Sequence, residues 1–366
     1  MIKINKRWEV GSEFHCLDYS VHKNDVLPWD KCNYYYFGSG RDSLRSIIRN
    51  IKCRNKSFTL WLPEYFCQEV VLDLLREGIE IKFYPLDPES MKSDVSSINI
   101  KKNDAIMLIN LFGIKFFDEY DNIPTNVFII ENHTHDPFSF YAYNSKAHYC
   151  FASLRKTLPI PCGIVWSQNM INEVENYKIT KIRHKAISDK LIAMQLKSLY
   201  LKGFDLSKDI YRTIEIKAEK NMGRGNISLA PAWVESIVNS FPILNWREKR
   251  KNNYIKFLGY LDDKIKENIL LPKDINRTYP FMIIMLLRTK TERDKVRKML
   301  IENNIFPAIL WKPSKHKLFS TKNYEERHNA FSDRMLAIHC DMRYDHKDMR
   351  KVADILGKIY KRLQKR

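Results

Sequence analysis

The stretch Phe151-Ala152-Ser153-Leu154-Arg155-Lys156-Thr157-Leu158-Pro159-Ile160-Pro161-Cys162-Gly163 combines reactive side chains with a stiff Pro-x-Pro turn. Two apolar runs of strand length, residues 148–151 and 163–166, flank it. In a chain with 62 basic residues, a lysine is normally a surface residue. A position between two strands, however, removes water from the Lys156 amine and lowers its pKa, which favours nucleophilic chemistry.

The first half of the chain alternates apolar runs with amphipathic stretches, a pattern typical of a mostly parallel sheet covered by helices on both faces. The predicted strands are residues 34–37, 58–62, 79–84, 105–111, 127–130, 148–151 and 163–166, and the predicted helices are residues 42–51 and 68–77. In such α/β sheets ligands bind at the carboxyl ends of the strands.

The second half of the chain reads differently. Residues 170–270 are mainly helical and highly charged, and a smaller α/β section follows. Its predicted strands are residues 281–287 and 306–311, and its predicted helices are residues 293–303 and 348–363. We therefore predict a large domain over residues 1–245 and a small C-terminal domain over residues 246–366.

Composition bounds the class of protein. The 366 residues are 44% hydrophobic and 29% charged, enough to bury a core. The net charge of +19 is compatible with nucleic acid, anionic lipid or phosphorylated substrates, but the basic residues are spread along predicted helices, as on an ordinary solvated surface.

No run reaches the ~18 apolar residues of a membrane span. Seven cysteines without a CxxC pair and no visible signal peptide predict reduced thiols and a cytoplasmic location.

Two further polar stretches follow predicted strands. Residues 38–43, Gly-Ser-Gly-Arg-Asp-Ser, form a turn before a helix, where backbone N–H groups and the helix dipole can hold a phosphate, although many such turns bind nothing. Residues 129–136 end in a polar cluster that includes His133 and His135. No third ligand stands at a characteristic spacing, so we predict no metal site.

The order of these three stretches resembles the fold-type-I enzymes that use pyridoxal 5′-phosphate (PLP), and more narrowly the DegT-like (DegT/DnrJ/StrS-type) sugar aminotransferases. The resemblance covers most of the chain. It continues through residues 62–67, 111–113, 225–228, 249–254 and 338–344. It implies the aspartate-aminotransferase fold.

The resemblance also implies roles for individual residues. Lys156 matches the Schiff-base lysine, which also shuttles a proton. Gly40, Arg41 and Asp42 match the turn whose backbone N–H groups hold the cofactor phosphate. Ser153 could add a hydroxyl group to this phosphate site. His135 matches a position beside the cofactor ring, and either Phe66 or Cys67 matches the residue stacked on it. Asn226 matches an asparagine that reaches the cofactor of the neighbouring subunit, which implies a homodimer.

One position departs from the family. The residue after Glu131 is normally an aspartate that pairs with the protonated pyridine nitrogen of PLP, but here it is Asn132. A lost charge-assisted hydrogen bond in a buried site costs about 1.5–3 kcal/mol, or ~10–100-fold. Glu131, His133 or Asp136 could take over the aspartate's role if the register shifts by one residue.

The leading hypothesis is a PLP-dependent aminotransferase that transfers an amino group, most simply from glutamate, to a nucleotide-linked keto sugar. Its product would serve amino-sugar biosynthesis, with cell-surface polysaccharide the commoner setting for the family. One alternative keeps PLP but alters the reaction because of Asn132. Another is a non-catalytic protein with a basic binding surface, although no nucleic-acid-binding motif supports it.

Overall fold

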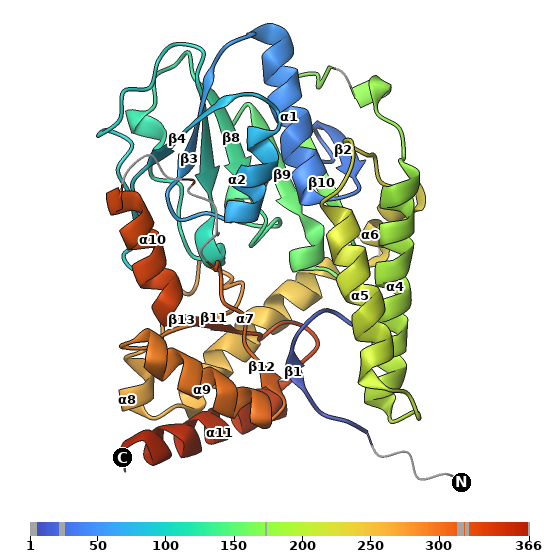
Figure 1. Ribbon diagram of the computed structural model, residues 1–366, viewed down its shortest axis with the longest axis vertical. Helices are drawn as coiled ribbons and strands as arrows, with labels where there is room; N and C mark the ends of the chain where they lie inside the picture. The colour runs from blue at the N-terminus through green and yellow to red at the C-terminus, as the bar shows by residue number, and fades with distance from the viewer. Residues whose placement is uncertain (1–5, 22–25, 173, 313–317, 319–321, 365–366) are drawn as a thin grey trace.

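The computed structural model describes residues 6–21, 26–172, 174–312, 318 and 322–364. Its main sheet has seven strands (Figure 1). In spatial order they are β2 (Asn33–Phe37), β10 (Gly163–Ser167), β9 (Tyr149–Ser153), β8 (Phe128–Asn132), β7 (Ala105–Ile109), β3 (Thr59–Pro63) and β4 (Glu80–Tyr84). Only β10 runs antiparallel to its neighbours β2 and β9 among these strands. The predicted mostly parallel sheet is confirmed.

Helix α1 (Gly40–Arg54) covers one face of this sheet and contacts β9 and β10. Its apolar residues recur at helical spacing, so that Leu44, Ile47, Ile48 and Ile51 are all buried on one side. The side chain of Ser39 caps its first turn. The opposite face of the sheet packs against a second apolar cluster, which contains Trp29 and residues of α6 (Trp233–Ser240). The sheet is therefore buried on both faces, as its apolar strands predicted.

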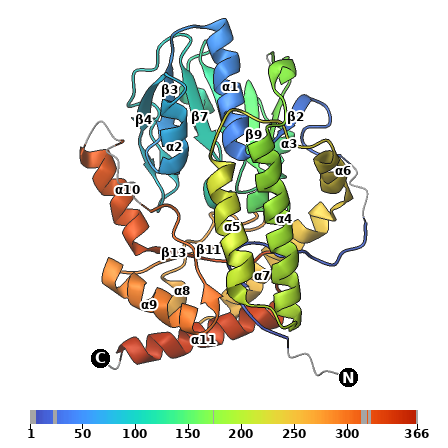
Figure 2. The ribbon, with the colours of Figure 1, turned by 45° about the vertical axis from the view of Figure 1, so that its right-hand side comes forward.

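The remaining helices are α2 (Gln68–Leu75), α3 (Phe140–Tyr143), α4 (Lys181–Lys202), α5 (Lys208–Met222), α7 (Ile243–Tyr260), α8 (Asp263–Lys266), α9 (Lys290–Glu302), α10 (Lys322–Arg334) and α11 (His346–Gln364). The short strands are β1 (Val10–Gly11), β5 (Leu86–Asp87), β6 (Lys92–Ser93), β11 (Ile283–Leu286), β12 (Ile305–Phe306) and β13 (Met335–Ile338). Helices α4 and α5 form a long hairpin that runs down one side of the molecule (Figure 2).

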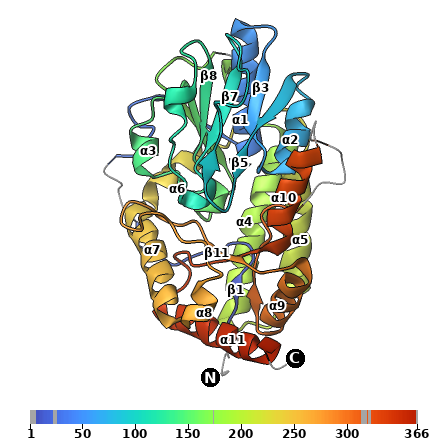
Figure 3. The same ribbon diagram turned by 90° about the vertical axis from the view of Figure 1, so that its left-hand side faces the viewer.

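The C-terminal part contains the antiparallel pair β11–β13, with α7, α8, α9 and α11 around it (Figure 3). Strand β1, from the beginning of the chain, pairs with β12 in this part. The apolar cluster of the main sheet continues into Phe281, Phe331 and Met335, so packing is continuous between the two parts. The division between residues 245 and 246 stays a prediction.

Two local expectations differ from the structure. The strand predicted over residues 306–311 shrinks to β12 and an isolated bridge between Ala308 and Ala337, because Pro307 has no N–H to donate to a ladder. Helix α10 and strand β13 were not predicted; α10 buries only His328, Phe331 and Ser332, too few apolar positions for a clear pattern. No helix in the described part of the chain combines the length and apolarity of a membrane span.

Asp136 connects the end of the main sheet to α7. Its buried carboxylate pairs with Arg247 at 2.7 Å and with Arg250 at 3.1 Å. Arg250 is itself buried, so neither charge can be hydrated if its partner is lost. This pair therefore ties the two parts of the chain together electrostatically.

We expect Asp136→Asn to lower the free energy of unfolding by about 3–5 kcal/mol, because it leaves Arg250 buried without its counter-charge. Urea denaturation followed by circular dichroism measures this. Asp263→Asn is the matched control: its carboxylate pairs with Lys266 on the open surface, and the exchange should change nothing measurable. Equal stability of the two variants would contradict the structural role of Asp136.

Candidate active site

Within the part of the chain that the structure describes, two backbone donors at the start of α1 have no partner. The Asp42 N–H is bound by Ser39 Oγ at 3.1 Å, and the Ser43 N–H by the Ser39 carbonyl at 3.0 Å. The N–H groups of Gly40 and Arg41 come too early in the helix for an intrahelical partner. Two free donors at the positive end of a helix dipole form an anion-binding site.

The Asp42 carboxylate holds this turn rather than facing a ligand. It pairs with the guanidinium of Arg183 on α4 at 2.7 Å, and both side chains are about 1% exposed. Arg183 also donates to the carbonyls of Asn221 and Met222 at the end of α5. The Arg41 side chain turns away to pair with Asp73 at 3.0 Å. Of residues 40–42, the backbone of the first two is what remains available.

The end of β9 lies directly against the same turn. A Cβ on Gly40 would come within 2.5 Å of the Ser153 Cβ, and a Cβ on Gly163 within 2.6 Å of the Gly40 nitrogen. Only glycine allows so close an approach. The Ser153 hydroxyl group therefore lies beside the free donors of α1, and its role at a phosphate stays a prediction.

A chain of hydrogen bonds connects Ser153 to Asn132 on the neighbouring strand. The Ser153 N–H donates to Thr134 Oγ1 at 3.1 Å, and the Thr134 N–H donates to Asn132 Oδ1 at 3.0 Å. Asn132 is buried and pairs in register with Phe151, whose side chain belongs to the cluster under α1. Asn132 therefore lies on the α1 face of the sheet.

Lys156 ends a 3₁₀ turn, Leu154–Lys156, that follows β9 immediately. Buried Leu158, Ile160 and Cys162 anchor the loop after it, whereas the Lys156 side chain is exposed. The amine is thus held on a short loop three residues beyond Ser153. A lysine becomes nucleophilic where loss of hydration or a neighbouring cation lowers its pKa.

Charged side chains from distant segments surround Lys156. Arg155 pairs with Glu219 of α5 at 2.9 Å, and Glu219 also pairs with Lys190 of α4 at 2.7 Å. The Arg155 charge, followed by loss of hydration, lowers the pKa of Lys156, and Glu219 and Glu13 partly oppose this. The lowered pKa agrees with the sequence prediction, but no local sequence pattern indicates Glu13 or Glu219.

Glu13 reaches this region on the segment after β1. The Glu13 carbonyl accepts hydrogen bonds from Lys197 Nζ at 2.7 Å and from Arg343 Nη1 at 2.9 Å. Burial alone would raise the pKa of its carboxyl group, but Lys190, Arg155 and Lys156 outweigh burial and lower it. An ionised carboxylate from the beginning of the chain therefore faces the lysine.

His135 is neutral in this site. Burial, followed by the positive charge of Lys156, lowers its pKa to about 3. Its Nδ1 accepts the Phe112 N–H at 2.9 Å, and its ring stacks on Phe281 with centroids 4.7 Å apart. Nδ1 is then the acceptor nitrogen, and Nε2 carries the proton.

The two ring-stacking candidates differ in their surroundings. Phe66 is 4% exposed and packs edge-on against Trp311 within the core. Cys67 is half-buried at the start of α2; burial raises the pKa of its thiol, and the charge of Lys156 opposes this. The choice between Phe66 and Cys67 stays open.

Asn226 is exposed on the loop between α5 and α6. The same loop lies beside the α1 turn, because the Gly38 N–H donates to the Ser228 carbonyl at 2.8 Å and Arg45 donates to the Gly225 carbonyl at 3.2 Å. An exposed amide near the anion site is where a second subunit could approach. The role of Asn226 stays a prediction.

Glu131 and His133 lie on the other face of the sheet. Glu131 pairs in register with Cys150 and accepts from Tyr120 at 2.5 Å, and His133 Nε2 lies 2.7 Å from its other carboxylate oxygen. Tyr120 and His133 satisfy the Glu131 carboxylate, as Arg247 satisfies that of Asp136. The suggestion that Glu131, His133 or Asp136 takes over the role of the missing aspartate stays a prediction.

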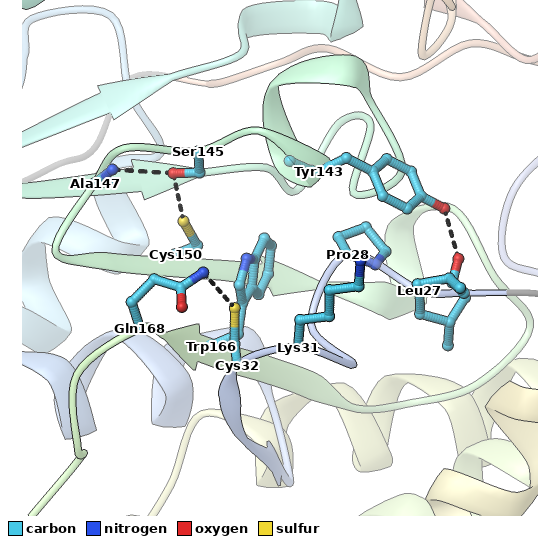
Figure 4. Close-up of a pocket in the computed structure, with 12 residues that line it drawn as sticks. Leu27, Pro28, Lys31, Cys32, Tyr143, Ser145, Ala147, Cys150, Trp166 and Gln168 are labelled. Carbon is cyan, nitrogen blue, oxygen red and sulfur yellow. Dashed lines mark hydrogen bonds between the residues drawn. The ribbon is translucent and has the colours of Figure 1, made fainter.

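The cluster around Glu131 contains side chains of the types that bind metal ions. Atoms of Glu131, His133 and Cys150 lie within 4.8 Å of one another, close enough to bind one metal ion, and His135 is not part of this group. Sequence reasoning missed Cys150 because it lies on the next strand. Cys150 also lines a pocket of about 160 Å³ with Cys32, Ser145 and Trp166 (Figure 4). Both features lie across the sheet from Asn132.

No family model and no curated protein matches the sequence. Solved structures match the fold. Helicobacter pylori PseC, an aminotransferase involved in the biosynthesis of pseudoaminic acid, has a TM-score of 0.60 at 14% identity, over 97% of this chain and 100% of its own. The putative sugar aminotransferase Spr1654 from Streptococcus pneumoniae, in its PLP form, has a TM-score of 0.59 at 11% identity, over 89% and 87%. DesI, solved with its TDP-sugar product, has a TM-score of 0.55 at 14% identity, over 88% and 79%.

The chain therefore has the fold of sugar aminotransferases. This confirms the fold that the resemblance to the DegT-like family implied. Within that fold, Lys156, the free donors of α1 and Asn132 surround one location at the carboxyl ends of β8 and β9.

We expect Arg155→Met to raise the pKa of Lys156, because it removes the largest influence that lowers it. The amine should then react with acetic anhydride only at higher pH, as measured by competitive labelling and mass spectrometry. Glu219→Gln should shift the labelling midpoint in the opposite direction, since Glu219 favours the charged amine. Arg76→Met, on the open surface, is the control. A labelling midpoint that changes in neither the Arg155 nor the Glu219 variant would contradict this electrostatic account.

Proposed function

We propose that the chain is a PLP-dependent aminotransferase in which Lys156 holds the cofactor. The observation that carries this proposal is the contact between Gly40 and Ser153. This contact forms an anion site from two free N–H donors and a hydroxyl group. The site lies only three residues from Lys156, an exposed lysine of lowered pKa. A ligand with a phosphate at one end and an amine-reactive carbonyl group at the other fits this combination.

Different residues of the site would hold different parts of the cofactor. The Gly40 and Arg41 N–H groups and the Ser153 hydroxyl group would hold the phosphate. The Lys156 amine would hold the carbonyl carbon, with Phe66 or Cys67, His135 and Asn132 around the ring. When bound, PLP supplies the electron sink that aminotransfer needs.

The chain's own groups supply the proton transfer. The lowered pKa of Lys156 increases the fraction of neutral amine at neutral pH, so that it can accept a proton from the substrate carbon and return it. Because His135 is neutral, its Nε2–H group can donate a hydrogen bond to a bound ligand without adding a positive charge beside Lys156. Glu13 and Glu219 balance the charge of Arg155 and Lys190 around this centre.

The substrate in this proposal is a nucleotide-linked keto sugar, with glutamate as the amino donor. DesI, which shares the fold, was solved with a TDP-sugar product. The net charge of +19 suits a diphosphate-bearing substrate. The exposed Asn226 supports a homodimer with shared sites, and the proposal includes a cytoplasmic enzyme serving amino-sugar and cell-surface polysaccharide synthesis.

We expect Lys156→Ala to lose the visible absorbance of bound PLP and all turnover, because it removes the amine that would form the Schiff base. Borohydride reduction should fix the cofactor on a Lys156 peptide of the unaltered protein, as seen by mass spectrometry. Lys146→Ala, an exposed lysine on the loop before β9, should retain both properties. Cofactor fixed elsewhere, or a protein that takes up no PLP, would refute the assignment.

The substrate is tested by a half-reaction screen. The protein loaded with PLP is mixed with glutamate, and absorbance reports amino transfer to the cofactor. The aminated form is then mixed with a panel of keto sugars linked to different nucleotides, and mass spectrometry identifies any amino sugar. Turnover with free keto acids alone would contradict the sugar substrate. Affinity for polyanions that falls steeply with salt and does not depend on Lys156 would favour the non-catalytic alternative.

A further inference from the structure

The orientation of the Asn132 amide group is fixed by the backbone. A backbone N–H can only donate, so the atom that receives the Thr134 N–H at 3.0 Å must be the amide oxygen. Thr134 is itself held by the Ser153 N–H at 3.1 Å. The Asn132 side chain therefore cannot turn its oxygen towards the site without breaking this connection.

The other end of the amide group is a pair of N–H donors. Within the described part of the chain, Asn132 Nδ2 has no hydrogen-bonding partner, although the residue is only 4% exposed. The carboxylates nearest to it in sequence are bound elsewhere, Glu131 to Tyr120 and His133 on the opposite face and Asp136 to Arg247. The site thus presents a neutral donor where the DegT-like family presents an anionic acceptor.

Building on the proposed function, we propose that Asn132 Nδ2 donates a hydrogen bond to the pyridine nitrogen of PLP and keeps that nitrogen unprotonated. A protonated ring nitrogen would place its N–H against the amide N–H groups, leaving buried donors without acceptors. An unprotonated nitrogen offers the lone pair that the amide group needs. The same position occupied by a carboxylate would favour the protonated ring.

The ring nitrogen can be observed directly. Apo protein is loaded with PLP that carries ¹⁵N in the ring, and its ¹⁵N chemical shift is measured through the neutral pH range. We expect the shift of an unprotonated, hydrogen-bonded pyridine for the natural protein. A protonated shift would overturn the inference while leaving the proposed function intact.

Asn132→Asp is the matched variant, because its oxygen can still accept the Thr134 N–H and the fold is retained. We expect it to move the ring nitrogen to the protonated shift and to speed the half-reaction with glutamate by roughly 10–100-fold. An unchanged shift would mean that residue 132 does not govern the nitrogen, and would overturn the inference.

Glu131→Gln is the control on the opposite face: its amide oxygen can still accept from the Tyr120 hydroxyl group, and its NH₂ group can donate to His133 Nε2 once the ring proton lies on Nδ1. It should leave the ¹⁵N shift unchanged; a shift that moves with Glu131 would assign control of the ring to that carboxylate and overturn the inference. Failure of the natural protein to bind PLP would refute the proposed function, and this inference with it. The two failures are thus distinguishable.

Discussion

The candidate site depends on one close approach between three stretches of backbone. The start of α1, the end of β9 and the start of β10 meet at Gly40, Ser153 and Gly163, where an added Cβ would lie within 2.6 Å of its neighbours. This contact sets the distance between the helix N-terminus and Lys156, because the lysine follows Ser153 on a short rigid turn. It also aligns Asn132 with both, through the hydrogen bonds of Thr134. A larger residue at either glycine would separate the anion site from the amine.

Successive side chains of a strand point to opposite faces of the sheet, so neighbouring residues of β8 contribute to different sites. Glu131 and Asn132 are adjacent in sequence, yet one faces Cys150 and the other faces the site under α1. A one-residue change of register would bring the Glu131 carboxylate to the α1 face in place of the Asn132 amide. The hydrogen bonds of Glu131 to Tyr120 and His133 on its own face oppose such a slip.

Local patterns predicted much of the fold and the core of the site. The strands of the main sheet are apolar because they are buried on both faces, and the turn before α1 is marked by its glycines and its serine cap. The choice between Phe66 and Cys67 could not be made from sequence, because both lie in one turn and only packing against Trp311 separates them. The charges around Lys156 were also missed. Glu219 lies 64 residues from Arg155, and no local pattern relates them.

The segment after β1 has a consequence for the order in which the molecule forms. Gly11 donates to the Tyr344 hydroxyl group at 2.8 Å, Arg343 binds the Glu13 carbonyl, and β1 pairs with β12. During synthesis, earlier segments leave the ribosome before later ones. Gly11 and Glu13 must nevertheless wait for Tyr344 and Arg343, which are synthesised 333 and 330 residues later. The backbone beside Glu13 therefore reaches its native position only after residue 344 has been added.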